Sequence, residues 1–261
     1  MLTPLIKRLT QFVIHSFIGL NIIQLQAFEL RTAAQDSRPK FIKTLKNENA
    51  VMAGLEIDII RAIESVDSDI KFIGQNSFMP IGRIITELKS GRLDIFIGAG
   101  KTDSRIKNLI FIDPPLYPVH HVLLAKIDEP LNITSYSQLK ALGKKGSTLT
   151  ILNTGTQRHL EAIGDLKVTP IQSVPTMLEL VALGRARFAY YHDLGLTYAA
   201  RKYALDDAFK ILPTKFHTYH HYAVLSKHTP NAYLKRIKSA IIQLKKSGIL
   251  RKIHQKYTSV Q

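Results

Sequence analysis

The sequence contains a glycine-rich turn followed by an arginine that could bind a carboxylate. In the stretch GRLDIFIGAGKTDSR, a short apolar segment runs into Gly98 and Gly100 and then reaches Arg105. Glycines let backbone groups approach a small ligand without an intervening side chain, and a guanidinium offers a planar fork of donors that suits a carboxylate. This pattern predicts a ligand-binding loop. The alternative is that Thr102 or Asp103 begins a helix and leaves Arg105 in solvent.

A second loop could bind the same anion. In LTILNTGTQRHLEA, an apolar strand ends at Asn153, and Gly155 and Thr156 lead into a helix. The backbone N–H groups at the start of a helix have no intrahelical acceptor and bind anions well. An ordinary connection between a strand and a helix is the alternative.

The elements that must position these loops occur twice along the chain. The segments MPIGRIITELKSGRLDIFIG and SVPTMLELVALGRARFAYY each read as a helix, a Gly-Arg pair and a short strand. Two similar units far apart in the sequence predict two similar α/β lobes. Helices followed by buried strands favour mainly parallel sheets, whose ligands lie beyond the carboxyl ends of the strands.

The first 27 residues have the order of a secretory signal. Lys7 and Arg8 precede a mostly apolar run, and the small residue Ala27 ends it. A membrane anchor is the rival interpretation, but polar residues interrupt the run. Cleavage would lower the formal net charge from +16 to +14, because 34 basic and 20 acidic residues remain. The expected location is therefore the periplasm.

Cysteine usage and hydropathy fit an exported protein that folds by core burial. The chain contains no cysteine, so we expect neither disulfides nor a thiol that could carry a lipid. No stretch after the first 27 residues reaches the roughly 18 apolar residues that a membrane span needs. The basic segments are not interleaved with aromatic residues, so nucleic-acid binding is not expected.

Motifs in order along the chain resemble the bacterial periplasmic solute-binding proteins of the amino-acid type, family 3 of the substrate-binding components of ABC transporters. The first-lobe motifs are GLEIDIIRAIE, PIGRIITELKSGRLDIFIGAGKTDSR and FIDPPLY. The second-lobe motifs are YSQLKAL, NTGTQRHLEA and VPTMLELVALGRARFAYYHDL, and the closing helix pair is LKRIKSAIIQLKKSGILRKIHQKY. The resemblance covers nearly all of residues 28–257, and the order of the motifs is its specific feature.

The resemblance implies an α/β fold of the type II periplasmic-binding-protein class. We expect a two-lobed clamshell in which each lobe is a mainly parallel sheet flanked by helices. After the signal peptide 1–27, lobe 1 would comprise 28–118 and 217–261, and lobe 2 would comprise 119–216. Two crossing strands would form the hinge, and the ligand would lie between the lobes.

The resemblance also assigns roles to residues of the two loops. It implies that Arg105 grips the carboxylate of a bound amino acid and that Gly155 and Thr156 close on the same group. Asp193, just after FAYYH, would receive the amino group of the ligand, since a buried ammonium needs an anion. Alternatively, Asp193 caps a helix that begins near Leu194.

The first ligand loop of the family corresponds to AAQDSRPKFIK, where this chain departs from the pattern. Asp36 is the acidic candidate but is offset, and Ser37 stands where an aromatic residue would help. Phe78 could supply the stacking face instead, although such a residue is more often part of a core. The excess of cationic groups favours an acidic amino acid or another small carboxylate as the ligand.

Histidines are concentrated on the two predicted hinge strands, near 117–126 and 209–227. They are His120 and His121 on one strand, and His217, His220 and His221 on the other. Alternation along a strand would place His217, Tyr219 and His221 on one face. A metal site, a pH-sensitive hinge and separate histidines are the possible interpretations. No carboxylate or cysteine completes a metal-ligand pattern, so neither a metal ligand nor a cofactor is expected.

The resemblance implies a monomeric binding protein that captures a small carboxylate-bearing solute, an amino acid by analogy, and delivers it to an inner-membrane ABC permease or sensor. A ligand-sensing receptor component and a dehydratase-like enzyme on the same clamshell are the alternatives. An enzyme would need a general acid or base in the cleft. His192 is the only obvious candidate, and strand alternation would point it away from the face of Asp193. We therefore expect binding without chemistry.

Overall fold

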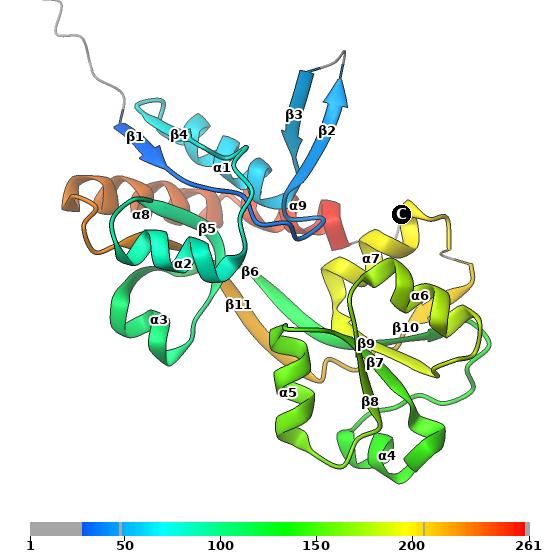
Figure 1. Cartoon of the computed structure of the whole chain (residues 1–261). Helices are drawn as coiled ribbons and strands as arrows, with labels where there is room; N and C mark the ends of the chain where they lie inside the picture. Colours follow the sequence, from blue (N-terminus) through cyan, green and yellow to red (C-terminus); the bar gives the residue numbers. More distant parts are fainter. Residues whose placement is uncertain (1–27, 47–48, 206, 259–261) are drawn as a thin grey trace, which may run out of the picture.

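The computed structural model describes residues 28–46, 49–205 and 207–258, so the predicted signal peptide lies outside the described residues. Figure 1 shows two lobes connected by two long strands. These strands are β6, Leu109–Lys126, and β11, His217–Ser226, and they pair with each other antiparallel. Both predicted hinge segments are thus strands that cross from one lobe to the other.

One seven-stranded sheet runs through both lobes in the order β5-β11-β6-β9-β7-β8, with β10 paired to β6. Its other strands are β5 Ile95–Gly100, β7 Thr148–Ile151, β8 Val168–Ile171, β9 Phe188–His192 and β10 Phe209–Ile211. Strand β7 is parallel to β8 and β9, whereas the pairs that involve β6 or β11 are antiparallel. The predicted α/β class is confirmed, and the central sheet is mixed because the crossing strands run against their neighbours.

The first lobe is formed by segments from both halves of the described chain. Its strands beside the central sheet are β1 Phe28–Arg31, β2 Ile42–Lys46, β3 Asn49–Ala53 and β4 Ile70–Ile73. Its helices are α1 Leu55–Val66, α2 Ile81–Lys89, α3 Asp103–Asn108, α8 Asn231–Lys246 and α9 Ile249–Thr258. One apolar cluster joins residues from Leu30 to Leu250, which binds the early and late segments into a single core.

The second lobe contains the middle of the chain. Its helices are α4 Tyr136–Ala141, α5 Gly155–Ile163, α6 Val174–Ala182 and α7 Asp193–Lys202, with a short 3-10 turn at Gly143–Gly146. Two further apolar clusters lie between Val122 and Leu212 and fill this lobe. Among the helices that the structure describes, none is long and apolar enough to cross a bilayer.

The repeated helix-to-strand unit is confirmed in both lobes. Helix α2 leads through Gly91 into β5, and α6 leads through Gly184 into β9. Both glycines have positive φ, 74° and 68°, a conformation that glycine adopts without the penalty of a Cβ atom. The two units therefore end their helices in the same way and present two strand ends to the space between the lobes.

Candidate functional site

A cavity of about 370 Å³ lies between the two lobes. The residues that line it from the first lobe and the crossing strands are Gln35, Ser37, Lys40, Ile81, Gly98, Ala99, Gly100, Lys101, Thr102, Arg105, His121, His217, Tyr219 and His221. Those from the second lobe are Asn153, Thr154, Gly155, Thr156, Arg158, His159, Tyr191 and His192. We call this cavity the cleft. Its volume is within the range of about 300–1,000 Å³ that small-molecule sites occupy.

Arg105 lies in the cleft and also belongs to a capped helix. Helix α3 begins at Asp103, and its N-cap Thr102 accepts a hydrogen bond from Arg105 N at 3.3 Å. The guanidinium donates from Nη1 to Gly100 O at 3.0 Å, which holds the side chain against the glycine turn. Burial, followed by the nearby charge of Arg158, lowers the pKa of Arg105. The segment TDSR therefore begins a helix that Thr102 caps, and it also places the Arg105 side chain in the cleft.

A side chain at position 98 would collide with the buried side chain of Glu56. The φ of Gly98 is +98°, and a Cβ atom there would lie 1.6 Å from Oε1 of Glu56. A Cβ on Gly100, by contrast, would meet Tyr219 at 3.4 Å, an ordinary contact. The sequence suggested that both glycines make room for a ligand; at Gly98 the requirement comes from the buried Glu56 side chain.

Replacing Gly98 with alanine is expected to lower the free energy of unfolding by about 2–6 kcal/mol, because positive φ and overpacking each cost about 1–3 kcal/mol. Chemical denaturation at fixed pH measures this loss. Gly155→Ala is the matched control, since a Cβ there would meet no atom within 4 Å. Equal stability of the two variants would contradict the role given to Glu56.

The start of α5 forms the opposite wall of the cleft. Thr154 is the N-cap and accepts a hydrogen bond from Gln157 N at 3.3 Å. The buried Thr156 hydroxyl is held by Thr154 at 2.6 Å and by Thr150 at 3.2 Å. Because the first-turn N–H groups of Gly155 and Thr156 have no intrahelical acceptor, they are available to an anion in the cleft.

Three predicted site residues are not brought together with the others. Asp36 lines a neighbouring cavity that shares Ser37 and Tyr191 with the cleft. Phe78 forms a bridge with Ala34, is 36% exposed and does not line the cleft. The aromatic faces in the cleft belong instead to Tyr191 and Tyr219, which lie at the end of β9 and on β11.

Asp193 is the third of these residues, and its neighbour His192 occupies the cleft. The Asp193 carboxylate accepts hydrogen bonds from its own helix at Leu194 N, 2.9 Å, and from His120 N, 3.2 Å. It therefore holds a crossing strand against the first turn of α7, but it is not the cap that the alternative interpretation proposed, because the N-cap of α7 is His192. His192 ends β9 on the face that lines the cleft, opposite to Asp193.

The proton position on His192 follows from its hydrogen bond. His192 Nδ1 accepts from Gly195 N at 2.9 Å, so a neutral ring carries its proton on Nε2 and is a donor. Burial lowers the pKa of His192 well below its usual value, which keeps the ring neutral. The side chain at the end of β9 is thus a hydrogen-bond donor where a carboxylate was expected.

A buried polar group lies beneath the cleft floor. Glu56 accepts a hydrogen bond from the Tyr117 hydroxyl, and that hydroxyl is also 2.9 Å from His221 Nδ1. Burial raises the pKa of Glu56 to about 7, while the charge of Lys40 and the Tyr117 hydrogen bond oppose the rise. Burial lowers the pKa of Lys40. Lys40 and Glu56 are neighbours, since Glu56 N donates to Lys40 O at 3.0 Å, and the charge of each opposes the effect of burial on the pKa of the other.

His121, His217 and His221 of the crossing strands line the cleft together with His159 of α5, whereas His120 and His220 do not, as the predicted alternation along β11 requires for His217 and His221. The ring centroid of His121 lies 5.1 Å from that of His217 and 5.6 Å from that of His159, and the last two are 4.5 Å apart. Tyr190 and Tyr136 hold the outer nitrogens of His121 and His159 at 3.2 and 2.9 Å. We call His121, His159 and His217 the histidine wall. Over the described residues, no group of three or more His, Cys, Asp or Glu is arranged to hold a metal ion.

Two rings of the histidine wall, those of His121 and His159, are neutral. Burial, then the charges of His217 and His159, lowers the pKa of His121 to about 3. Burial also lowers the pKa of His159, with a smaller contribution from His217. At neutral pH these rings are single N–H donors. The interpretation that the histidines of the two strands are separate, at the surface or half-buried, does not describe His121 and His217, whose ring centroids are 5.1 Å apart.

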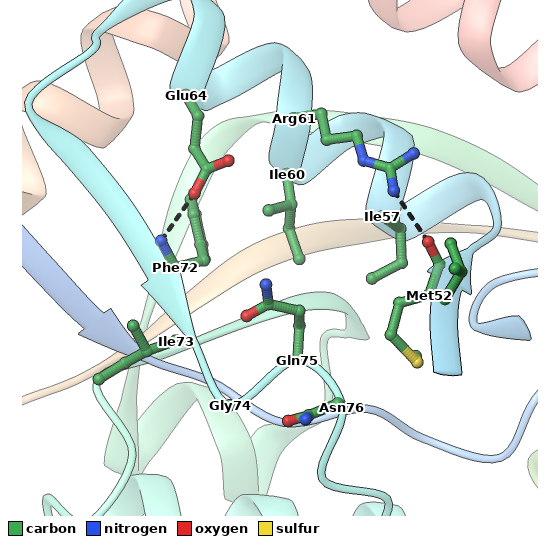
Figure 2. Close-up of a pocket in the computed structure, with 11 residues that line it drawn as sticks. Met52, Ile57, Ile60, Arg61, Glu64, Phe72, Ile73, Gly74, Gln75 and Asn76 are labelled. Atoms are coloured by element: carbon green, nitrogen blue, oxygen red, sulfur yellow. Dashed lines mark hydrogen bonds between the residues drawn. The ribbon is translucent and has the colours of Figure 1, made fainter. Parts of the chain in front are cut away.

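A second cavity of about 550 Å³ lies within the first lobe beside the β2–β3 hairpin, as Figure 2 shows. Its charged groups are already engaged. Arg61 donates to Met52 O at 2.9 Å, and Glu64 accepts from Phe72 N at 2.8 Å. No residue of the second lobe lines this cavity. Although it is larger than the cleft, it is not placed for a ligand held between the lobes.

Sequence reasoning did not single out several residues of the cleft. Arg158 stands in the NTGTQRHLEA motif, three residues after Gly155, where the spacing on a helix could have indicated it. His159 follows it, and Lys40 is in the first ligand loop. The proximity of Lys40 to Glu56 carries no local signal, because it depends on hydrogen bonds from Leu55 N to Pro39 O and from Glu56 N to Lys40 O, each 3.0 Å long.

Comparisons with known proteins give a family and a fold. The family model described as bacterial extracellular solute-binding proteins, family 3, matches residues 30–260. Among solved structures, the substrate-binding protein of an amino acid ABC transporter is 22% identical, with a TM-score of 0.66 and coverage of 88% of this chain and 98% of that one. No curated protein sequence matches this chain.

Two other solved structures with this fold are of proteins described with other roles. A histidine kinase sensor domain similar to periplasmic binding proteins is 21% identical, with a TM-score of 0.66, and covers 90% of this chain and 98% of its own. An ancestral amino-acid-binding protein, described as a precursor of cyclohexadienyl dehydratase, is 22% identical, with a TM-score of 0.65 and coverage of 88% and 96%. At these identities the likeness shows a shared fold alone.

Proposed function

This chain belongs to the bacterial extracellular solute-binding proteins of family 3, and from this premise we propose that it captures a small carboxylate-bearing solute between its lobes. Capture would take place in the periplasm, by a monomer, for delivery to an inner-membrane ABC permease. The lobes would move as the units 28–118 with 217–261 and 119–216, rotating about β6 and β11.

One observation carries the proposal: donors from both lobes line the same cavity. Arg105 and the glycine turn come from the first lobe, and the α5 start and Arg158 come from the second. An anion bound by both walls would favour closure, because only the closed form makes both sets of contacts. We propose Gly98, Gly100, Arg105, Gly155 and Thr156 as the residues around the ligand carboxylate.

A screen of the purified mature protein tests this function. Thermal melting would be measured with amino acids, small carboxylates and amines, since a ligand at 100 times its dissociation constant stabilises a protein by about 2.7 kcal/mol. We expect carboxylates to raise the melting temperature and amines without a carboxylate to leave it unchanged. Stabilisation by the amines alone would contradict the proposal.

A dehydratase-like enzyme is the second candidate, because one solved relative is described as a precursor of such an enzyme. The groups in reach are weak candidates for catalysis: His192 is neutral and engaged with Gly195, and Glu56 lies behind Gly98 rather than on the cleft wall. We expect the stabilising ligand to be recovered unchanged after prolonged incubation. Accumulation of product beyond the amount of protein would reverse this conclusion.

A further inference from the structure

The charges of the cleft are unbalanced. Four cationic side chains line it, Lys40, Lys101, Arg105 and Arg158, and none of the described residues that line it is an aspartate or glutamate. A site of this composition attracts anions and repels cations.

Two of the four cations have an acidic neighbour outside the lining. Lys40 adjoins the buried Glu56, whose backbone N–H donates to Lys40 O at 3.0 Å and whose charge opposes the effect of burial on the Lys40 pKa. Lys101 Nζ lies 3.3 Å from Asp113 and 4.2 Å from the ring centroid of Tyr222, so its ammonium is directed to that side of the sheet.

The remaining cations are two arginines on opposite walls. Within the part of the chain that the structure describes, neither Arg105 nor Arg158 forms a salt bridge. They are close enough that the charge of Arg158 lowers the pKa of Arg105. A bound molecule with two negative charges would neutralise both, whereas a zwitterionic amino acid has no net charge and would leave the site with the net charge of the two arginines.

The same cleft is poorly suited to an ammonium group. Burying an ammonium is costly unless a carboxylate pairs with it. Asp193 is engaged outside the cleft, and His192 presents a donor in its place. The histidine wall supplies no carboxylate either, and one ring nitrogen each of His159 and His121 is already hydrogen-bonded to Tyr136 and Tyr190.

We propose that the solute of the cleft is a small dicarboxylate without an amino group, with one carboxylate bound by Arg105 and the other by Arg158. This inference rests on the proposed function, since it concerns the same site. The first carboxylate also meets the free N–H groups of Gly155 and Thr156, and the second faces the histidine wall. A guanidinium fork suits each carboxylate.

Matched ligand pairs that differ only in the amino group test the chemical class. Calorimetric titration of the mature protein would compare succinate with aspartate, glutarate with glutamate, and adipate with 2-aminoadipate, with inorganic phosphate and sulfate in parallel. We expect the deaminated member of the best-binding pair to bind at least tenfold more tightly, and phosphate and sulfate to bind more weakly than it. Tighter binding of the amino acid, or of phosphate or sulfate, would overturn the inference.

A second titration tests whether Arg158 binds the second carboxylate. Replacing one carboxylate of the best dicarboxylate with an amide should weaken binding to the wild type at least tenfold. In Arg158→Gln the same replacement should cost less than threefold, because its partner is already absent. Arg185→Gln is the control, since Arg185 is an exposed arginine of the same lobe outside the cleft. Equal costs in the wild type and in Arg158→Gln would overturn the assignment.

The outcomes separate this inference from the proposed function. Amino acids that bind more tightly than their deaminated partners, and lose affinity in Arg105→Ala, would reject the dicarboxylate while leaving solute capture in place. Failure of every carboxylate and amino acid in the series to bind would reject both.

Discussion

Replacing Arg105 with alanine is expected to weaken binding of the best carboxylate by about 2–5 kcal/mol, which is the cost of leaving a buried charge without its partner. The side chain is held in the cleft by its hydrogen bond to Gly100 O, so its fork is in place before a ligand arrives. Arg105→Lys keeps the charge but loses the fork, and we expect an intermediate affinity. Calorimetric titration of both variants measures these losses.

The same variants should keep their stability. The Arg105 guanidinium forms one hydrogen bond to the protein and no salt bridge with a described residue, so its removal is expected to change the free energy of unfolding by only about 0.5 kcal/mol. Arg83→Ala is the control, because Arg83 is exposed on α2 outside the cleft. Near-normal affinity in Arg105→Ala would reject the carboxylate contact. Lost affinity together with a large fall in melting temperature would make Arg105 a structural residue.

The free energy of unfolding is expected to fall steeply when the pH is lowered from 6 to 5. Burial lowers the pKa of His121 to about 3 and places the pKa values of His192 and His221 well below their usual range. An unfolded histidine has a pKa of about 6.5. In this window the unfolded chain takes up protons that the folded chain does not, so acid favours unfolding.

Glu56 has the opposite effect. Its folded pKa of about 7 is above the ordinary 4.5, so it contributes stability at low pH that is lost as the pH rises towards 7. Each group contributes up to about 1.4 kcal/mol per pH unit, so these three histidines against this one carboxyl give a net slope of up to about 2.7 kcal/mol per pH unit. The histidines outnumber the carboxyl, so the free energy of unfolding falls as the pH is lowered.

Urea denaturation at intervals between pH 7 and pH 5 measures this slope. His121→Gln should reduce it by up to about 1.4 kcal/mol per pH unit, because one titrating group is removed. His228→Gln, at an exposed histidine, is the control and should leave the slope unchanged. Constant stability over this range would show that the buried rings do not remain neutral.

Local signals made the repeated unit predictable. Helix α2 and strand β5, and likewise α6 and β9, have apolar spacing and a terminating glycine within about 20 residues of sequence. The mixed sheet was not predictable from these units. Its antiparallel pairs depend on β6 and β11, which are brought together across about a hundred residues of chain.

The site was predictable where a residue lies next to a turn that the sequence marks. Arg105 follows the glycine turn, and Gly155 begins α5, so both were found and both line the cleft. Asp193 and His192 are neighbours on opposite faces at the point where β9 becomes α7, so a one-residue ambiguity exchanged a carboxylate for an imidazole. That Lys40 lies beside Glu56 could not be predicted from the sequence, because tertiary contacts bring the two segments together.

The proposed function requires that the two lobes close around the solute. The chain has no cysteine, so labels can be placed at will. Lys107→Cys on α3 and Ala162→Cys on α5 introduce two exposed sites on helices that form opposite walls of the cleft. The spin-label distance between them, measured by double electron–electron resonance, should shorten at saturation with the best carboxylate, and Arg105→Ala should prevent the change at the same concentration. An identical distance distribution with and without saturating ligand would contradict capture between the lobes.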